Sequence, residues 1–156
     1  MNQGREYAEL IWPLDILMVV CFLMLAVNIW GTTLRRKERR LYISVWNFMA
    51  ASLIIAFVYA IGNVIWDTRG ALSGMNDAIL NYFYVHNLFN VWFTTGFFGL
   101  AFYLLPRLSG NPIWSYRLAV WGFASVWMGQ HHLLYGPGPD WLELLSVSFS
   151  ILAAVP

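Results

Sequence analysis

The sequence contains few charged residues and a single cysteine. Of its 156 residues, 11% are charged, while 60% are hydrophobic and 18% are aromatic, which is far more apolar than a soluble domain of this length. Cys21 stands alone within an apolar run, so neither a disulfide framework nor a cysteine metal site can be drawn. Internal repeats, phosphate-binding glycine loops and serine-nucleophile motifs are also missing from the sequence.

The sequence instead contains several long apolar runs. A helix needs about 20 mostly apolar residues to cross about 30 Å of hydrocarbon. We therefore predict an all-α, polytopic transmembrane bundle of about five spanning helices in one membrane domain. The predicted helices cover residues 10–30, 41–66, 78–105, 113–135 and 141–156. The last is short and ends without a polar flank, from which we expect a chain truncated at its C-terminus.

The few charges alternate along the connections between these runs. Five basic residues lie in the segment RRKERR at positions 35–40, and Arg107 and Arg117 bracket the third connection. The N-terminal segment and the other two connections are acidic or mixed. By the positive-inside rule, we expect loops 35–40 and 106–117 to be cytoplasmic and the N-terminus to lie outside. Because the basic run stands between two apolar spans, we expect no nucleic-acid partner.

The sequence has only three histidines, and all three fall within predicted spans. Ionisable side chains are costly in hydrocarbon, so residues of this kind indicate a functional site. His86 lies about 12 Å below the outer end of the third helix, and His131 and His132 lie about 8 Å below the outer end of the fourth. Because these helices are antiparallel neighbours, we expect their histidines to meet.

Neutral imidazole is a common ligand of copper, iron and zinc, and three imidazoles leave a coordination position free for a small substrate. We therefore predict a metal site formed by His86, His131 and His132. A single histidine in a membrane helix is also compatible with hydrogen bonding or packing. The position of all three histidines at one depth favours the metal.

Several short segments resemble the catalytic subunit I of cbb-type haem-copper cytochrome c oxidases and of their nitric oxide reductase relatives. The resemblance covers residues 9–156 and rests on the strings YVHN (84–87), TGFFG (95–99), YLLP (103–106), SYRL (115–118), WMGQHHLLY (127–135) and PDW (139–141). It implies a fold of about twelve helices, of which this chain would be the central portion, in a bacterial-type inner membrane.

The resemblance also implies cofactors and partners. The matching three histidines of that family hold the non-haem metal, copper in oxidases and usually iron in nitric oxide reductases, opposite a high-spin haem. A pair of b-type haems would be ligated mainly by helices missing from this chain. Expected partners are c-type cytochrome subunits or cytochrome c, the other helices of the same subunit, the lipid membrane and a small gas substrate, NO or O2.

One departure from the family's pattern concerns Ser125. In cbb-type oxidases, a tyrosine six residues before the His-His pair is linked to the first histidine and supplies an electron and a proton to oxygen cleavage. Serine cannot form a stabilised phenoxyl radical. A regular helix would place Ser125 one heptad from His132, where its hydroxyl can donate a hydrogen bond or hold a water. Tyr82, Tyr84 or Tyr135 could substitute for the missing phenol.

A second departure is Asn90, four residues after His86 and on the same helix face. Nitric oxide reductases carry a glutamate here, and cbb-type oxidases carry a small residue. An amide can bind the metal weakly or hold a hydrogen-bonded intermediate, and interhelical hydrogen bonding is the alternative.

We therefore expect an oxidoreductase segment, with Ser125 and Asn90 as candidate catalytic residues, and favour the reduction of NO to N2O. The first alternative is a cbb-type oxidase that reduces O2 to water with proton pumping. Further alternatives are a non-catalytic membrane scaffold, a proton-conducting subunit and an inactive descendant of the family.

Overall fold

A computed structural model describes residues 5–65, 74–125 and 130–154. Across these ranges the chain is helical, which confirms the all-α prediction. The elements are α1 (Trp12–Leu34), α2 (Ile43–Tyr59), the π-helix η1 (Ala60–Ile65), α3 (Gly74–His86), the π-helix η2 (Asn87–Thr94), α4 (Thr95–Ser109), α5 (Tyr116–Ala124), the 3-10 helix η3 (Gln130–Leu133) and α6 (Asp140–Ala153).

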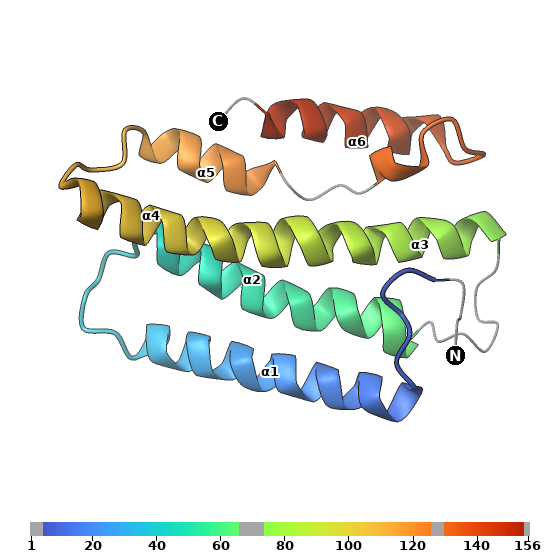
Figure 1. Cartoon of the computed structure of the whole chain (residues 1–156), viewed down its shortest axis with the longest axis horizontal. Helices are drawn as coiled ribbons and strands as arrows, with labels where there is room; N and C mark the ends of the chain where they lie inside the picture. The colour runs from blue at the N-terminus through green and yellow to red at the C-terminus, as the bar shows by residue number, and fades with distance from the viewer. Residues whose placement is uncertain (1–4, 66–73, 126–129, 155–156) are drawn as a thin grey trace.

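The helices lie side by side along the long axis of the molecule (Figure 1). Helices α3, η2 and α4 form one continuous rod of 36 residues, Gly74–Ser109. In Figure 1, α1 and most of α2 lie below this rod and α5 and α6 lie above it, while the start of α2 passes behind the rod and contacts α5. Loops 35–42 and 110–115 are at the same end of the molecule, and the N-terminal segment is at the opposite end.

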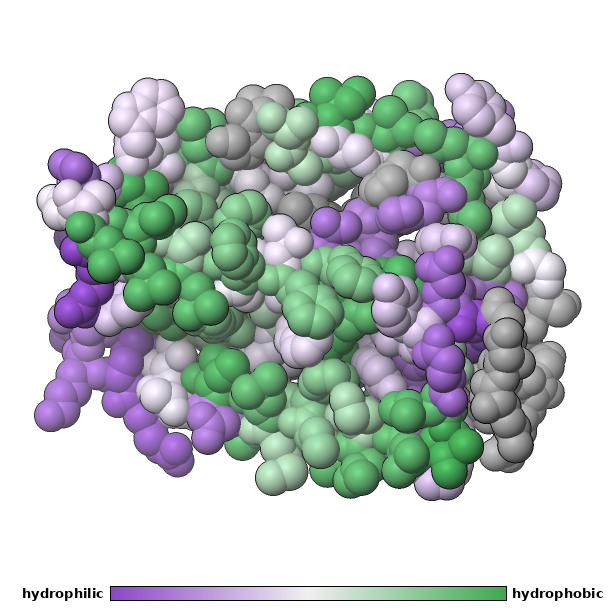
Figure 2. Space-filling view, viewed as in Figure 1, coloured by the Kyte–Doolittle hydropathy of each residue, from purple (hydrophilic) through white to green (hydrophobic). Residues whose placement is uncertain are grey.

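Three helices in the described ranges are long and apolar enough to cross a membrane: Trp12–Leu34, Ile43–Val64 and Gly74–Ser109. They contain most of the first three predicted spans. Helices α5 and α6 have 9 and 14 residues, which is shorter than the roughly 20 residues that a perpendicular crossing requires. The surface agrees with a lipid environment, because hydrophobic residues cover much of the middle in Figure 2 and hydrophilic ones gather at the ends.

The predicted fourth span, 113–135, differs from the structure. Its α-helix ends at Ala124, and Gln130–Leu133 is wound as a 3-10 helix; residues 126–129 lie outside the described ranges. Ser125 caps the end of α5 and donates its hydroxyl to the carbonyl of Gly122 at 3.1 Å. Serine competes in this way with helical hydrogen bonds and favours helix ends. The prediction that Ser125 lies one heptad before His132 on the same helix face assumed a regular helix, and α5 ends before that helix would reach His132.

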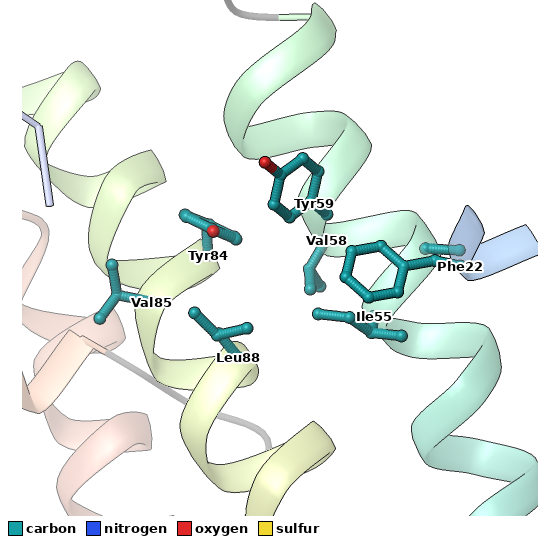
Figure 3. Packing of buried hydrophobic residues seen from close by; sticks show 8 residues of the cluster. Phe22, Ile55, Val58, Tyr59, Tyr84, Val85 and Leu88 are labelled. Atoms are coloured by element: carbon teal, nitrogen blue, oxygen red, sulfur yellow. The ribbon is translucent and has the colours of Figure 1, made fainter. Parts of the chain in front are cut away.

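The core lies between α1, α2 and the rod. Figure 3 shows Phe22 of α1, Ile55 and Tyr59 of α2, and Tyr84 and Leu88 of the rod converging on one another. The rings of Tyr59 and Tyr84 meet edge to face, with centroids 5.7 Å apart. Such aromatic contacts add to the packing energy of the apolar side chains. This cluster fixes the face that the rod turns toward α2.

A buried carboxylate joins α1 to α2 beside this cluster. Asp15, in the first turn of α1, is buried and accepts a hydrogen bond of 2.8 Å from the hydroxyl of Tyr59. A buried acid is costly without such a partner, while a negative charge in the first turn also suits the helix dipole. The pair therefore holds the two helices at a defined depth relative to each other.

Gly62 of η1 allows a close approach to Tyr84 of the rod. A Cβ atom at this position would lie 2.5 Å from Cγ of Tyr84, so any larger residue must displace the helix or the buried ring. We expect Gly62→Ala to lower the free energy of unfolding of the intact complex by about 1–3 kcal/mol, measured by thermal denaturation. Gly96→Ala is the matched control, because a Cβ there meets nothing within 4 Å. Equal stability of both variants would contradict this prediction.

Candidate metal centre

The structure brings two of the three histidines together. His86 is the last residue of α3 and is 5% exposed, and His132 lies in η3. Nδ1 of His86 is 3.2 Å from Nε2 of His132, and the ring centroids are 5.4 Å apart with planes at 65°. Forty-six positions separate these residues in the chain, so the contact depends on η3 packing beside α3.

The third histidine, His131, also belongs to η3, but its side chain lies outside the described part of the structure. Among the side chains that are described, no group of three or more His, Cys, Asp or Glu residues converges as a metal site. The role of His86, His131 and His132 as joint ligands therefore stays a prediction.

Asn90 lies beside His86. Its amide nitrogen is 3.1 Å from Nδ1 and 3.4 Å from Nε2 of that ring. Which hydrogen each group carries depends on the tautomer of the histidine. The amide is thus placed to orient the imidazole and to reach a ligand next to it. Its catalytic role is likewise a prediction.

The residues directly after His86 are wound as a π-helix, a form that is rare and frequently found at functional sites. Side chains explain its position. The amide of Asn87 donates to the carbonyl of Phe83 at 2.7 Å, which is the acceptor that an α-helix would offer to the backbone N–H of Asn87. This competition at the carbonyl of Phe83 favours the wider turn. The hydroxyl of Thr94 donates to the carbonyl of Phe89, five residues earlier, at 2.9 Å.

Tyr82 covers the other side of His132. The two rings are stacked, with centroids 5.4 Å apart and planes at 15°. The Tyr82 hydroxyl donates to Oε1 of Glu6 at 3.4 Å. Stacking on one face and the contact with His86 at Nε2 together define the direction of the His132 ring.

The N-terminal segment is fixed along α3 by several polar contacts. Glu6 and Asn81 exchange two hydrogen bonds of 3.1 Å between the Glu6 backbone and the Asn81 amide. Arg5 pairs with Asp77 at 3.2 Å, and the Tyr84 hydroxyl donates to the carbonyl of Tyr7 at 3.2 Å. The segment is therefore held against the turns of α3 that precede His86.

These contacts distinguish the three tyrosines that the sequence offered as substitutes for the missing phenol. Tyr82 touches the histidine pair. The phenol of Tyr84 is committed to Tyr7, and Tyr135 is 98% exposed. The ring contact of Tyr82 is with His132 in a different element, so no local spacing in the sequence indicates it. Glu6 was missed, because no local pattern connects residues 76 positions apart.

Comparison with known proteins decides the family. The family model described as cytochrome c and quinol oxidase polypeptide I matches residues 1–156. The chain belongs to this family. It is 33% identical to cytochrome c oxidase subunit 1 of Rhodobacter capsulatus, over 99% of this chain and 31% of the relative. It is also 33% identical to the cbb3-type cytochrome c oxidase subunit CcoN1 of Stutzerimonas stutzeri, over 99% of this chain and 35% of the relative.

A third relative, a cytochrome c oxidase subunit 1 homolog of Azorhizobium caulinodans, is 33% identical over 100% of this chain and 30% of its own length. The chain thus spans about a third of the curated relatives that it matches. These findings confirm the predicted resemblance to haem-copper oxidase subunit I. The chain is a multi-pass membrane segment of a subunit in an oxidoreductase family.

The histidine pair has a donor set that suits the metal expected in this family. Two nitrogens 3.2 Å apart, each at about 2.0–2.1 Å from one ion, would subtend about 100° at that ion. This angle lies between those of square-planar and tetrahedral coordination, the geometries of copper, nickel and zinc sites with nitrogen ligands. His86 and His132 can therefore act as adjacent ligands of one ion.

Proposed function

We propose that His86, His131 and His132 hold a non-haem metal, copper or iron, in the catalytic site of a membrane respiratory reductase that reduces a small gas molecule. The observation that carries the proposal is the 3.2 Å separation between the ring nitrogens of His86 and His132. The rest of the site would come from the parts of the subunit beyond this chain.

The sequence has only three histidines, so a haem with histidine ligands has to be bound by other helices of the subunit. With haem and metal bound, the site would supply electrons and an open coordination position to the gas. Electrons would reach it from a c-type cytochrome partner. The N-terminus would lie outside, as the positive-inside rule suggests for the alternating charges, and the common end of loops 35–42 and 110–115 supports this proposal.

The residues of this chain would position ligands and exclude water. Tyr82 stacks on His132 and Asn90 contacts His86, so each imidazole is oriented by a neighbour. Groups that orient metal ligands commonly change affinity or activity by about 10–100-fold when removed. The burial of His86 would restrict access of bulk water to that ring, while His132 is exposed in this chain.

We favour NO as the substrate, with two molecules reduced to N2O and water by two electrons and two protons. The reason is Ser125, which stands where oxidases of this type carry a redox-active tyrosine. Its hydroxyl donates to the carbonyl of Gly122, and serine cannot donate the electron that cleavage of O2 requires.

Reduction of O2 to water is the second candidate. The relatives at 33% identity are named as cytochrome c oxidase subunits, and the ring of Tyr82 stacks on His132. A phenol at this position could supply a hydrogen atom in place of the missing tyrosine. Gas-consumption rates separate the two candidates.

Metal quantification tests the proposal against a scaffold or a proton-conducting subunit. The intact complex should contain one more equivalent of copper or iron than the His131→Ala variant, because a ligand is removed. The haem spectrum should be retained in both preparations and serves as the measure of assembly. Unchanged metal content in the variant, with haem intact, would count against the metal centre.

Asn90 provides a finer test. We expect Asn90→Leu to lower gas turnover about tenfold, because one hydrogen bond worth about 1.4 kcal/mol is lost in the transition state. The metal content should stay unchanged. Asn111→Leu, an exchange of the same kind in the exposed 110–115 loop, is the control. Full activity of Asn90→Leu would indicate that the amide serves only packing.

A further inference from the structure

Two cavities adjoin at the start of α2, away from the histidines. The larger has a volume of about 670 Å³ and is lined by three arginines and three aromatic residues: Arg36, Arg39, Arg40, Tyr42, Trp46 and Tyr116. The smaller, of about 170 Å³, extends between α2 and α5 along Ile43, Val120 and Phe123. Trp46 and Tyr116 line both cavities. A cationic cavity thus lies next to an apolar groove.

The positive charge of the larger cavity is not neutralised by the described residues around it. Arg39 and Arg40 form no ion pair within the described ranges, and Glu38 is the single acid in segment 35–40. Arg36 is held by the carbonyls of Thr33 and Arg39 at 3.0 and 3.3 Å. Figure 2 shows hydrophilic residues gathered at the end of the molecule where segment 35–40 lies in Figure 1.

The aromatic walls are fixed by hydrogen bonds between elements. The Tyr42 hydroxyl donates to the carbonyl of Phe102 in α4 at 3.1 Å, and that of Tyr116 donates to the carbonyl of Leu41 at 3.3 Å. Their rings lie 6.5 Å apart. Trp46 remains 53% exposed. Aromatic residues of this kind are enriched at the headgroup level of a bilayer.

The start of α2 adds a further attraction for an anion. Its N-cap residue, Tyr42, makes no side-chain capping hydrogen bond, so the first amides of the helix are not satisfied by a cap. The helix dipole favours a negative group at this end, while the backbone amides of Val45 and Trp46 already donate to the carbonyl of Tyr42. Arginines bind phosphate oxygens by paired, charge-assisted hydrogen bonds.

We propose that this pair of cavities binds one anionic phospholipid, with its phosphate against Arg39 and Arg40 and an acyl chain in the groove between α2 and α5. The ligand is expected to be amphipathic, because the cationic cavity and the apolar groove lie next to each other and share Trp46 and Tyr116. Inorganic phosphate would use the cationic cavity alone. The proposal concerns a different end of the molecule from the histidines and does not depend on the reaction catalysed there.

The test uses the intact detergent-solubilised complex, with phosphatidylglycerol as the probe and native mass spectrometry as the readout. We expect the double variant Arg39→Ala/Arg40→Ala to bind this lipid about 30-fold more weakly, at about fivefold for each basic residue. Arg35→Ala/Lys37→Ala removes the same charge from residues that do not line the cavity. It should weaken binding less than about threefold, because exposed charges beyond the site are screened.

Filling the groove is the second arm. Val120→Trp should reduce phosphatidylglycerol binding as strongly as loss of the two arginines, while thermal stabilisation by inorganic phosphate should be unchanged. Three results would overturn the proposal. These are equal weakening in the Arg35→Ala/Lys37→Ala control, stabilisation by inorganic phosphate equal to that by the lipid, and a complex whose other helices occupy the cavities and bind no lipid there.

Discussion

The His86→Ala variant of the intact complex is expected to lose gas turnover by at least about 100-fold, together with its non-haem metal. Even residues that only orient metal ligands cost about 10–100-fold when removed, and His86 is proposed as a ligand itself. It is buried and its Nδ1 faces Nε2 of His132 at 3.2 Å. Removing the ring leaves one nitrogen of this pair and an open space beside Asn90.

The control is Tyr135→Phe, which lies three residues after His132 and is 98% exposed. It should retain both metal and turnover. Metal analysis and NO or O2 consumption are measured on the same preparations, with the haem spectrum as the measure of assembly. If His86→Ala keeps its metal and its activity while the haem is intact, the histidine pair is a packing contact and the proposed centre is wrong.

The intact complex is expected to consume NO at least about tenfold faster than O2, a difference of about 1.4 kcal/mol in activation free energy. The physical reason is the phenol missing at position 125, which leaves cleavage of O2 one donor short. Reduction of NO needs only two electrons for each product molecule. The two rates are measured with gas electrodes on one preparation, with the same reduced cytochrome c.

Two variants test whether the side chain of Ser125 or Tyr82 affects the ratio of the NO and O2 rates. Ser125→Ala should leave the ratio of rates unchanged, because its hydroxyl donates to the carbonyl of Gly122. Tyr82→Phe should also leave it unchanged if NO is the substrate. Rapid cyanide-sensitive O2 uptake with negligible NO turnover would refute the preference, and loss of that uptake in Tyr82→Phe would favour O2 reduction with a relocated phenol.

Apolar length and charge were sufficient to predict much of the membrane fold. The predicted span 78–105 falls within the rod Gly74–Ser109, and the predicted spans 10–30 and 41–66 overlap the other two candidates. The meeting of His86 and His132 followed from counting residues from two helix ends, because depth in an antiparallel pair depends only on the rise per residue.

Local winding was beyond this reasoning. The predicted helix 113–135 assumed regular α geometry, yet α5 ends at Ala124 and His132 lies in a 3-10 turn. The π-helix after His86 depends on side-chain hydrogen bonds such as that of Asn87 with the carbonyl of Phe83. These bonds compete with backbone hydrogen bonds, and the differences in free energy are small. The contact of Glu6 with Tyr82 bridges 76 positions, and periodicity carries no information about such pairs.

The π-helix η2 also changes the rotation of α4 about the rod axis relative to α3. A π turn holds more residues than an α turn, so every side chain of α4 is rotated relative to the direction that uninterrupted winding from α3 would give it. Gly99 is placed against Phe48 in this rotated setting. Returning Asn87–Thr94 to α winding at the same length would therefore rotate α4 about the rod axis and turn Gly99 away from Phe48, while His86 kept its orientation. The π-helix thus sets the contact of the far half of the rod with α2 independently of the direction of His86.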